Sequence, residues 1–194
     1  YYSDYIGRRR LSNQTKMQQR SLQYEDDKLI LQQHVKEGRL LDIGCNGGFF
    51  LDCLDNTFEK HGIELDATAV KYAHENYDFG TNVRCGNFLE AKYSEGSFDV
   101  LLMRGTIEHV PKPVEVIERC SKLLKEGALF YITATPNVDS LAAELFRDRW
   151  LLFHPIQHLW HFSPNTLRLV CDRFGLSFVS VAFSYLGTAY ENYQ

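Results

Sequence analysis

The sequence lacks the features that nucleic-acid-binding proteins and membrane-spanning proteins require. Lys and Arg number 21 against 25 Asp and Glu, so the formal net charge is −4. This balance gives no electrostatic footprint for nucleic acid. No apolar run approaches the ~20 residues that a membrane-spanning helix needs. We therefore expect neither a nucleic-acid partner nor a membrane span.

Cysteine is scarce and dispersed. The five cysteines include no CxxC pair, and an odd, scattered set is typical of reduced thiols. The sequence therefore predicts a cytoplasmic protein rather than a secreted one held together by disulfides. Internal repeats and low-complexity segments are also absent, so the 194 residues predict one domain with a core of its own.

Short apolar runs alternate with helical patterns along most of the chain. The runs lie at 40–43, 61–64, 82–85, 98–103 and 128–134, and a last helix (163–174) and strand (176–183) follow. Alternation of this kind implies right-handed crossovers. The sequence thus predicts an α/β fold, a Rossmann-like doubly wound, mostly parallel sheet with helices on both faces. Between the fourth and fifth runs, Pro111 and Pro113 open a helix, for which Gly127 is the expected C′ residue.

The most unusual local sequence follows the first predicted strand. Residues 42–48 read DIGCNGG, and such glycines let the backbone approach a ligand at a helix N-terminus, which favours an anionic group. The segment matches neither the dinucleotide fingerprint G-x-G-x-x-G nor a P-loop, because no G-K-[ST] follows. Asp42, at the end of the strand, would repel a pyrophosphate and suits a cationic group instead.

A second carboxylate ends the second predicted strand. Glu64 can accept hydrogen bonds from both hydroxyls of a ribose. The two strand ends therefore suit a ligand that has an adenosine ribose and an amine. S-adenosylmethionine (SAM) has both, together with a carboxylate for the helix N-terminus and a sulfonium cation.

Four segments in order resemble the class I SAM-dependent methyltransferases, in the broad subfamily that includes ubiquinone-biosynthesis O-methyltransferases. Residues 41–48 are similar to the loop LDIGCGTG, and 61–73 (HGIELDATAVKYA) to the strand and helix that follow it. Residues 98–137 resemble the block that contains EHV and ends in PN, and 158–175 the segment before the sixth strand. The resemblance covers roughly residues 39–183. It implies SAM as cofactor and S-adenosylhomocysteine as product.

The resemblance also implies a role for individual residues. The expected cofactor-binding residues are Asp42, Gly44 and Gly48 at the methionine part, Glu64 at the ribose, Leu65 at the adenine ring, Asn87 at the adenine amino group and Arg104 beside the sulfonium, with Cys45, Asn46 and Phe88 completing the set. Asn46 stands where the family usually has glycine, but asparagine tolerates a left-handed backbone. Asn87 replaces the usual Asp, and a simple turn residue is an equally good interpretation of it.

The resemblance leaves the C-terminal edge of the sheet open. The family's seventh strand would need most of the residues after Phe183, and 185–188 is more typical of a turn. The sequence thus leaves open whether the predicted sheet is complete at this edge. Residues 1–37, polar and aromatic with a weak helical stripe, are expected to form an N-terminal helical segment that covers the cofactor cleft. Residues 38–194 then form the SAM-binding domain.

Glu108 and His109 precede the Pro111 helix, near the place where the methyl group leaves. His109 is a candidate general base, because a pKa of ~6.5 suits a hydroxyl nucleophile. The alternative is a histidine that packs at the start of the helix. In similar ubiquinone-pathway enzymes an acidic and histidine cluster at this place is tied to a divalent metal. One Glu and one His are too few for such a site, so the sequence predicts no metal.

Residues 135–162 interrupt the strand–helix alternation and are expected to form an insertion on the substrate side. They hold both tryptophans and three histidines, a composition that suits a pocket for an apolar or ring-bearing acceptor. His158 and His161 are catalytic candidates. A lid or the surface of a possible homodimer fits the same residues equally well. The insertion should cover the mouth of the cofactor cleft.

The sequence therefore predicts a SAM-dependent methyltransferase that modifies a small molecule, with a hydroxyl oxygen as the favoured acceptor. A nitrogen or carbon acceptor, or a glycan or lipid precursor, is the alternative. A SAM-binding module without catalysis is a third hypothesis, in which residues 135–162 form a partner surface.

Overall fold

The computed structural model describes residues 14–182, with side chains from residue 20 onward. Within this range five parallel strands form one sheet in the order β3-β2-β1-β4-β5. The strands are β1 (Gly38–Ile43), β2 (Phe58–Glu64), β3 (Val83–Cys85), β4 (Phe98–Arg104) and β5 (Leu124–Thr133). The strand order reverses at β1, where the chain crosses from the β3 side of the sheet to the β5 side. A ligand site is expected beyond the carboxyl ends of the strands at such a switch point.

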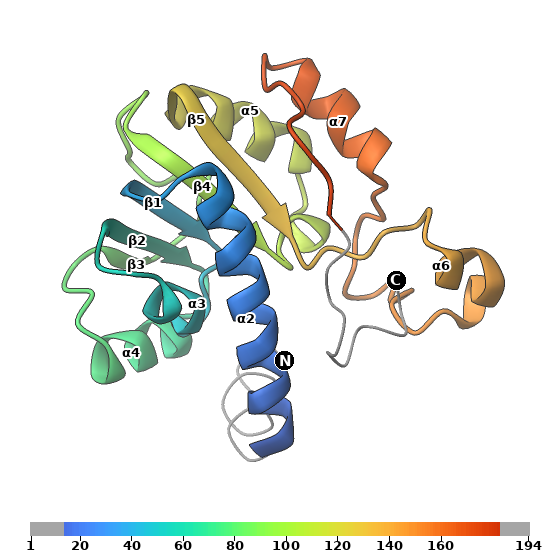
Figure 1. Cartoon of the computed structure of the whole chain (residues 1–194), viewed down its shortest axis with the longest axis horizontal. Helices are drawn as coiled ribbons and strands as arrows, with labels where there is room; N and C mark the ends of the chain where they lie inside the picture. Colours follow the sequence, from blue (N-terminus) through green and yellow to red (C-terminus); the bar gives the residue numbers. More distant parts are fainter. Residues whose placement is uncertain (1–13, 183–194) are drawn as a thin grey trace.

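Helices cover both faces of this sheet (Figure 1). The helices and 3-10 turns are α2 (Gln14–His34), α3 (Phe49–Cys53), α4 (Ala67–Asn76), η1 (Ile107–His109), α5 (Pro113–Leu123), α6 (Leu141–Phe146), η2 (Arg147–Arg149) and α7 (Pro164–Asp172). One apolar core contains side chains of α2, α3 and α4, and the other contains side chains of α5 with α7 packed against it. The predicted doubly wound, Rossmann-like fold is therefore confirmed.

The two central strands explain why the sequence shows continuous apolar runs rather than alternation. Leu40 and Val100 face one core, while Leu41 and Leu101 face the other, and all four side chains are fully buried. A strand covered by helices on both faces has no solvent-facing side. The polar residue Asp99 inside β4 accepts from the backbone N–H of Arg39 at 2.8 Å. The carboxylate thus satisfies a backbone N–H of the neighbouring strand β1.

Two local expectations are wrong. Gly127 does not cap α5, because that helix ends at Leu123 and β5 begins at once. Gly127 instead has a φ of +73° inside an irregularity of β5, where Phe98 pairs with Leu124 but Val100 pairs with Leu129. The strand expected at 176–183 is not formed over 176–182, which lie at the surface without ladder partners among the described residues. Phe183 lies outside the described residues, as do 1–13 of the N-terminal segment.

Candidate functional site

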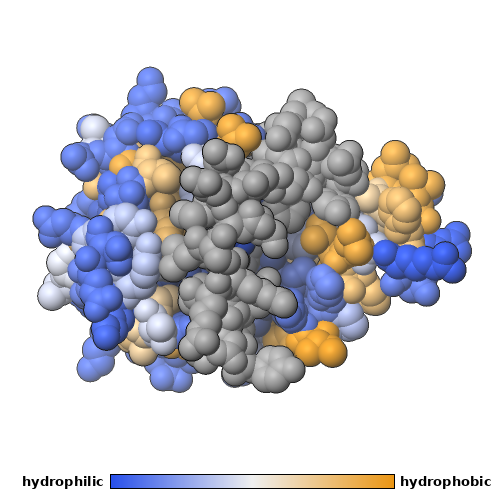
Figure 2. All heavy atoms as spheres, turned by 90° about the horizontal axis from the view of Figure 1, so that it is seen from below, coloured by the Kyte–Doolittle hydropathy of each residue, from blue (hydrophilic) through white to orange (hydrophobic). Residues whose placement is uncertain are grey.

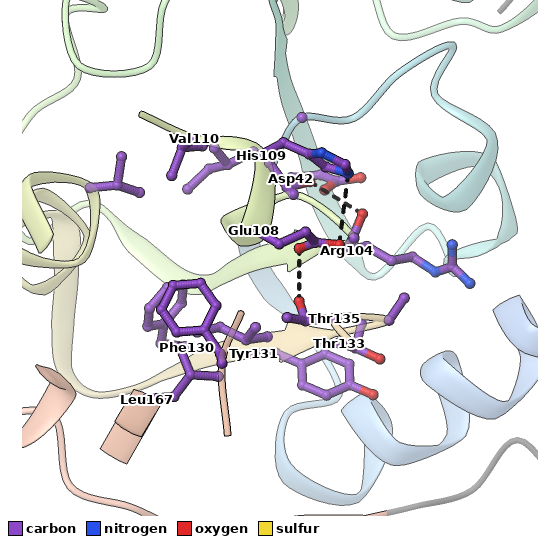
Figure 3. A pocket seen from close by; sticks show the side chains of 18 of the residues that line it. Asp42, Arg104, Glu108, His109, Val110, Phe130, Tyr131, Thr133, Thr135 and Leu167 are labelled. Carbon is purple, nitrogen blue, oxygen red and sulfur yellow. Dashed lines mark hydrogen bonds and ion pairs between the residues drawn. The ribbon is translucent and has the colours of Figure 1, made fainter. Parts of the chain in front are cut away.

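One continuous cavity runs along the carboxyl edge of the sheet and along β5, and Figure 3 shows part of it. The expected site residues that line it are Asp42, Gly44, Cys45, Asn46, Glu64, Leu65, Asn87, Phe88, Arg104, His109 and His158. Gly48 and His161 are not part of its lining. Arg20, Gln23 and Tyr24 of α2 also border the cavity. The fold therefore brings most of the predicted site residues to one place.

The glycine loop leaves β1 through three left-handed residues, Gly44, Asn46 and Gly48, with φ of +79°, +53° and +77°. The N–H of Gly44 donates to Ile63 O of β2 at 2.8 Å, which holds the loop across the end of the neighbouring strand. A Cβ at Gly44 would lie 2.7 Å from the side chain of Thr106. Glycine at this position is therefore required both by its backbone conformation and by the close approach of the loop after β4.

The Glu64 carboxylate accepts three backbone N–H groups. Oε2 accepts from Asn46 at 2.9 Å, and Oε1 accepts from Leu65 at 2.7 Å and Asp66 at 3.0 Å. Glu64 thus ties the glycine loop to the end of β2. A carboxylate has about four acceptor positions, so a ribose hydroxyl would share or replace these amides. Leu65 is 73% exposed although it is a large apolar side chain, and it borders the cavity where adenine is expected.

Asp42 is a buried carboxylate with one oxygen that has no hydrogen bond among the described residues. Its side chain is 2% exposed, and the oxygen in question is Oδ1. Burial raises the pKa of Asp42 to about 7, with Glu64 and Asp27 adding to the rise and Arg104 opposing it. A buried carboxyl without a hydrogen bond is costly to the folded protein. The side chain is therefore suited to meet a cationic ligand group.

Arg104, at the end of β4, is directed toward α2 and away from His109 (Figure 3). Its Nε donates to Oδ2 of the buried Asp27 at 2.7 Å, and its guanidinium lies over the ring of Tyr24. Asp27 also accepts from the hydroxyl of Thr133 at 2.6 Å, at the end of β5. This network fastens α2 to the carboxyl ends of β4 and β5. The role of Arg104 beside the sulfonium remains a prediction.

Three candidate residues from two distant segments converge beside this edge. One side-chain ligand atom each of Glu108, His109 and His158 lies within 4.8 Å of the others. Glu108 is 2% exposed, and its Oε2 accepts from the Thr135 hydroxyl at 3.1 Å, as Figure 3 shows. Burial raises the pKa of Glu108, an effect that His109 and the hydrogen bond from Thr135 oppose. The three residues together could hold a proton or a metal ion.

Sequence reasoning treated these histidines as separate candidates and missed that they converge. The signal was present in the fold prediction, because the loops after two neighbouring parallel strands leave the sheet at the same edge. Here the backbone N–H of Trp160 also donates to Glu108 O at 3.2 Å, which pins the insertion against η1. His158 is partly buried, and burial lowers its pKa, with His109 and other neighbouring histidines acting in the same direction.

His161 lies beside this cluster, with its ring centroid 6.2 Å from that of His158, but it is not one of the three residues whose ligand atoms converge. Its ring contacts that of Phe153, with the ring centroids 4.8 Å apart. Its Nε2 is buried and has no hydrogen bond within residues 14–182. The catalytic roles of His109, His158 and His161 stay predictions, but only the first two border the cavity.

The remainder of the insertion exposes apolar side chains. Figure 2 shows them gathered at the end of the molecule that α6 and η2 form, beside hydrophilic ones. The strongly exposed apolar residues of this segment are Leu141, Leu145, Phe146, Leu151, Ile156 and Leu159. Among the described residues, no helix is long and apolar enough to cross a bilayer.

The comparison with protein families identifies the domain. A family model described as "Methyltransferase domain" matches residues 16–181. The chain therefore belongs to the methyltransferase domain family. Membership implies SAM as the cofactor and the methyltransferases as the class of enzyme, so these predictions from the sequence are confirmed.

Two curated relatives and one solved structure refine this assignment. The chain is 32% identical over 120 residues to ubiquinone biosynthesis O-methyltransferase of Thiobacillus denitrificans, covering 59% of this chain and 52% of that one. It is 34% identical over 144 residues to the protein of the same name from Caulobacter vibrioides, covering 66% and 55%. The chain thus spans about half the length of these curated relatives. A SAM-dependent methyltransferase from Thermotoga maritima, described as a possible histamine N-methyltransferase, has the same fold, with a TM-score of 0.63, 21% identity, and 78% and 70% of the two chains covered.

The residues at the carboxyl edge fit this cofactor. The unpartnered oxygen of Asp42 suits the amine of SAM, and the left-handed loop brings backbone N–H groups near the start of α3. Glu64 offers a carboxylate at the end of β2, and Leu65 an open apolar surface. The sequence predicted each of these features.

Proposed function

We propose that the protein transfers a methyl group from SAM to a hydroxyl oxygen of a small molecule. The observation that carries this proposal is the Glu108–His109–His158 cluster, which borders the same cavity as Asp42 and the glycine loop. Methylation of a hydroxyl benefits from a nearby proton acceptor, because a hydroxyl is a poor nucleophile until its proton leaves. The names of the two curated relatives, both O-methyltransferases, support the same reaction.

The two imidazoles of the cluster are suited to accept that proton. Nδ1 of His109 lies 2.7 Å from Gln157 O and Nδ1 of His158 lies 2.9 Å from Leu152 O. A carbonyl oxygen only accepts, so each Nδ1 bears a hydrogen, and in the neutral imidazole each Nε2 then bears a lone pair. SAM, when bound, supplies a methyl group already activated by the sulfonium. The protein then needs to place the hydroxyl in line with that methyl group and to exclude water.

The acceptor we propose is a phenol or catechol with an apolar substituent. Phe130, Ile132 and Leu167 border the cavity beyond the cluster, and apolar walls with a few convergent polar groups are typical of sites for such molecules. The insertion 135–162 would cover the acceptor, while α2, fastened through Asp27, would cover the cofactor.

The test is a turnover assay with SAM and matched acceptors: 4-alkylcatechols, 4-alkylphenols, aliphatic alcohols and arylamines of similar size. We expect S-adenosylhomocysteine to form fastest with the catechols or phenols. Faster turnover of the amines would show that the acceptor atom is nitrogen rather than oxygen. SAM binding without turnover of any acceptor would favour the non-catalytic SAM-binding module.

Compartment and assembly are proposed in addition. All five cysteines are free thiols, and they lie on different parts of the fold, which favours a reducing compartment such as the cytoplasm. The exposed apolar side chains of α6 and of residues 151–159 support a homodimer. Light scattering of the purified protein would distinguish one chain from two.

A further inference from the structure

We propose that Asp27 is a positioning residue that makes the cofactor site prefer SAM to its product, S-adenosylhomocysteine. The two molecules differ in charge, because transfer of the methyl group turns the positive sulfonium into a neutral thioether. A site that distinguishes them by charge needs a negative excess around the cofactor. Asp27 maintains this excess indirectly, because it neutralises Arg104 and holds the guanidinium toward α2.

Arg104 lies on the cofactor side of the cavity. In the sheet, Asp42 of β1 pairs with Leu102 of β4, and Arg104 follows two residues later at the end of its strand. Asp42 and Arg104 both border the cavity, and the guanidinium opposes the rise in the pKa of Asp42. The positive charge of Arg104 therefore acts on the buried carboxyl that we expect to meet the SAM amine.

An uncompensated cation at this place would disfavour SAM. The resemblance to the methyltransferases implies that Arg104 lies beside the sulfonium, and two positive charges in a partly buried site repel each other. The Arg104 side chain is 16% exposed, so water screens its charge only in part. A buried cation without a partner is also costly to the folded protein. Arg104 is therefore compatible with bound SAM only when a carboxylate compensates its charge.

Asp27 supplies this carboxylate from α2. Its side chain is 1% exposed, and Oδ2 accepts a charge-assisted hydrogen bond from Arg104 Nε at 2.7 Å. Oδ1 accepts from the hydroxyls of Tyr131 and Thr133 at 3.2 Å and 2.6 Å, which fixes the carboxylate at the end of β5. The guanidinium carbon lies 4.5 Å from the centre of the Tyr24 ring of the same helix. These contacts hold the Arg104 side chain toward α2, the direction that Figure 3 shows.

The charges around the cofactor part of the cavity then leave a negative excess. At pH 8 the carboxylates of Asp42 and Glu64 are negative, while Asp27 and Arg104 compensate each other. SAM and S-adenosylhomocysteine both have an amine and a carboxylate, so the sulfonium is the group that gains from the excess in SAM alone. Without the charge of Asp27, the cation of Arg104 would cancel half of this excess. Arg20 also borders the cavity, but it stays the same in every comparison below.

The experiment is calorimetric titration with SAM and, separately, with S-adenosylhomocysteine at pH 8. The readout is the ratio of the two affinities, which requires no acceptor and therefore goes beyond the proposed function. Asp27→Asn should weaken SAM binding about tenfold more than product binding, the scale for unit charges about 10 Å apart at an effective dielectric constant of about 20. The double variant Asp27→Asn/Arg104→Gln removes both charges and should restore the wild-type ratio.

Two controls separate the effect of charge from the effect of a loosened helix. Asp55 forms another contact of α2, where it accepts from Lys28 at 2.8 Å and from Gln32 at 2.6 Å. Asp55→Asn makes the same chemical change as Asp27→Asn, but at an exposed residue outside the cavity lining. Thr133→Val removes one hydrogen bond to Asp27 without a change of charge. Each control should alter the affinities for SAM and for the product by the same factor.

Circular dichroism verifies that each variant is folded. An equal loss of affinity for the two ligands in Asp27→Asn would overturn the proposal, because it would leave Asp27 only the role of anchoring α2. A double variant that keeps the altered ratio would overturn it as well. If Asp27→Asn does not fold, Arg104→Gln alone provides the test, since Tyr131 and Thr133 still donate to Asp27. Loss of the cation should then raise the preference for SAM, and an unchanged or lower preference would contradict the proposal.

Discussion

The two halves of the cavity are built in different ways. On the cofactor side, backbone groups make the decisive contacts, because Glu64 accepts three amide N–H groups and Gly44 is fixed to Ile63 O. On the acceptor side, His109 and His158 are held by carbonyls of a segment with little regular structure. Short motifs encode the first kind of site, since its residues are neighbours in sequence. The second kind depends on contacts between segments about 50 residues apart.

The largest expected effect is on the acceptor side. His109→Ala should lower kcat about 10²- to 10⁴-fold, the usual contribution of a positioned base, while SAM affinity stays nearly constant. The measurement is S-adenosylhomocysteine formation at saturating SAM, with SAM binding followed by calorimetry. His154→Ala serves as control and should retain its rate. A loss of SAM affinity in His109→Ala as large as the loss of kcat would show that the two sides are not separable.

The second effect is on the cofactor side. Glu64→Ala should weaken SAM binding by roughly 1.5–3 kcal/mol, the scale of hydrogen bonds to a charged group. Glu64→Gln keeps the shape of the side chain but loses the charge, and the amide nitrogen no longer accepts the N–H groups that Oε1 or Oε2 accepts now. Calorimetry should therefore show tighter SAM binding by the wild type than by the Glu64→Gln or the Glu64→Ala variant. Unchanged affinity in both variants would remove Glu64 from the cofactor site.

The sequence predicted the local features of the fold and the site, and it missed those that depend on contacts between distant segments. The alternation of strands and helices and the left-handed backbone of Asn46 are local features, and the structure confirms both. Gly127 was misassigned because a glycine after a helix is as typical of a cap as of an irregular strand start. The strand expected at 176–183 failed over its described part because apolar alternation does not reveal whether a pairing partner exists. The convergence of His158 with Glu108 required the folded chain.

The third effect is the pH dependence of stability that the buried carboxyl of Asp42 should cause. The pKa of Asp42 in the folded protein is about 7, above the ordinary value of 3.8. At a pH between these two values the folded protein holds a proton that the unfolded chain has already released. Stability therefore falls as pH rises from about 4 to about 7, and the full penalty persists above that range. Asp42→Asn should stabilise the ligand-free protein at pH 8 by on the order of a few kcal/mol, and much less at pH 4. Urea denaturation at both pH values measures this difference.

Asp42 should also make cofactor binding pH-dependent. An ionised carboxylate favours the SAM amine, so wild-type affinity should rise by up to about tenfold between pH 6 and pH 8. The Asn variant should bind more weakly and with a flatter pH profile. A wild-type affinity independent of pH would show that Asp42 does not meet the amine.

The smallest expected effect concerns Asn87, where the sequence left adenine recognition and a simple turn equally open. The structure gives its side chain local partners: Oδ1 accepts from Leu89 N at 3.0 Å, and Nδ2 donates to Glu90 Oε1 at 3.1 Å. Asn87→Asp restores the usual family residue but places a carboxylate against Glu90. We therefore expect SAM affinity to change less than about threefold, because any gain at the adenine amino group is offset by this repulsion.

The double variant Asn87→Asp/Glu90→Gln separates the two contributions. Removing the Glu90 charge relieves the repulsion, so tighter SAM binding in the double variant than in Glu90→Gln alone would assign Asn87 to adenine recognition. Equal affinity in those two proteins would leave the turn as its role. Asn87→Ala should then cost about 1 kcal/mol of stability through the lost contact with Leu89 N, with SAM affinity unchanged. In that case the side chain of Asn87 would serve the fold alone.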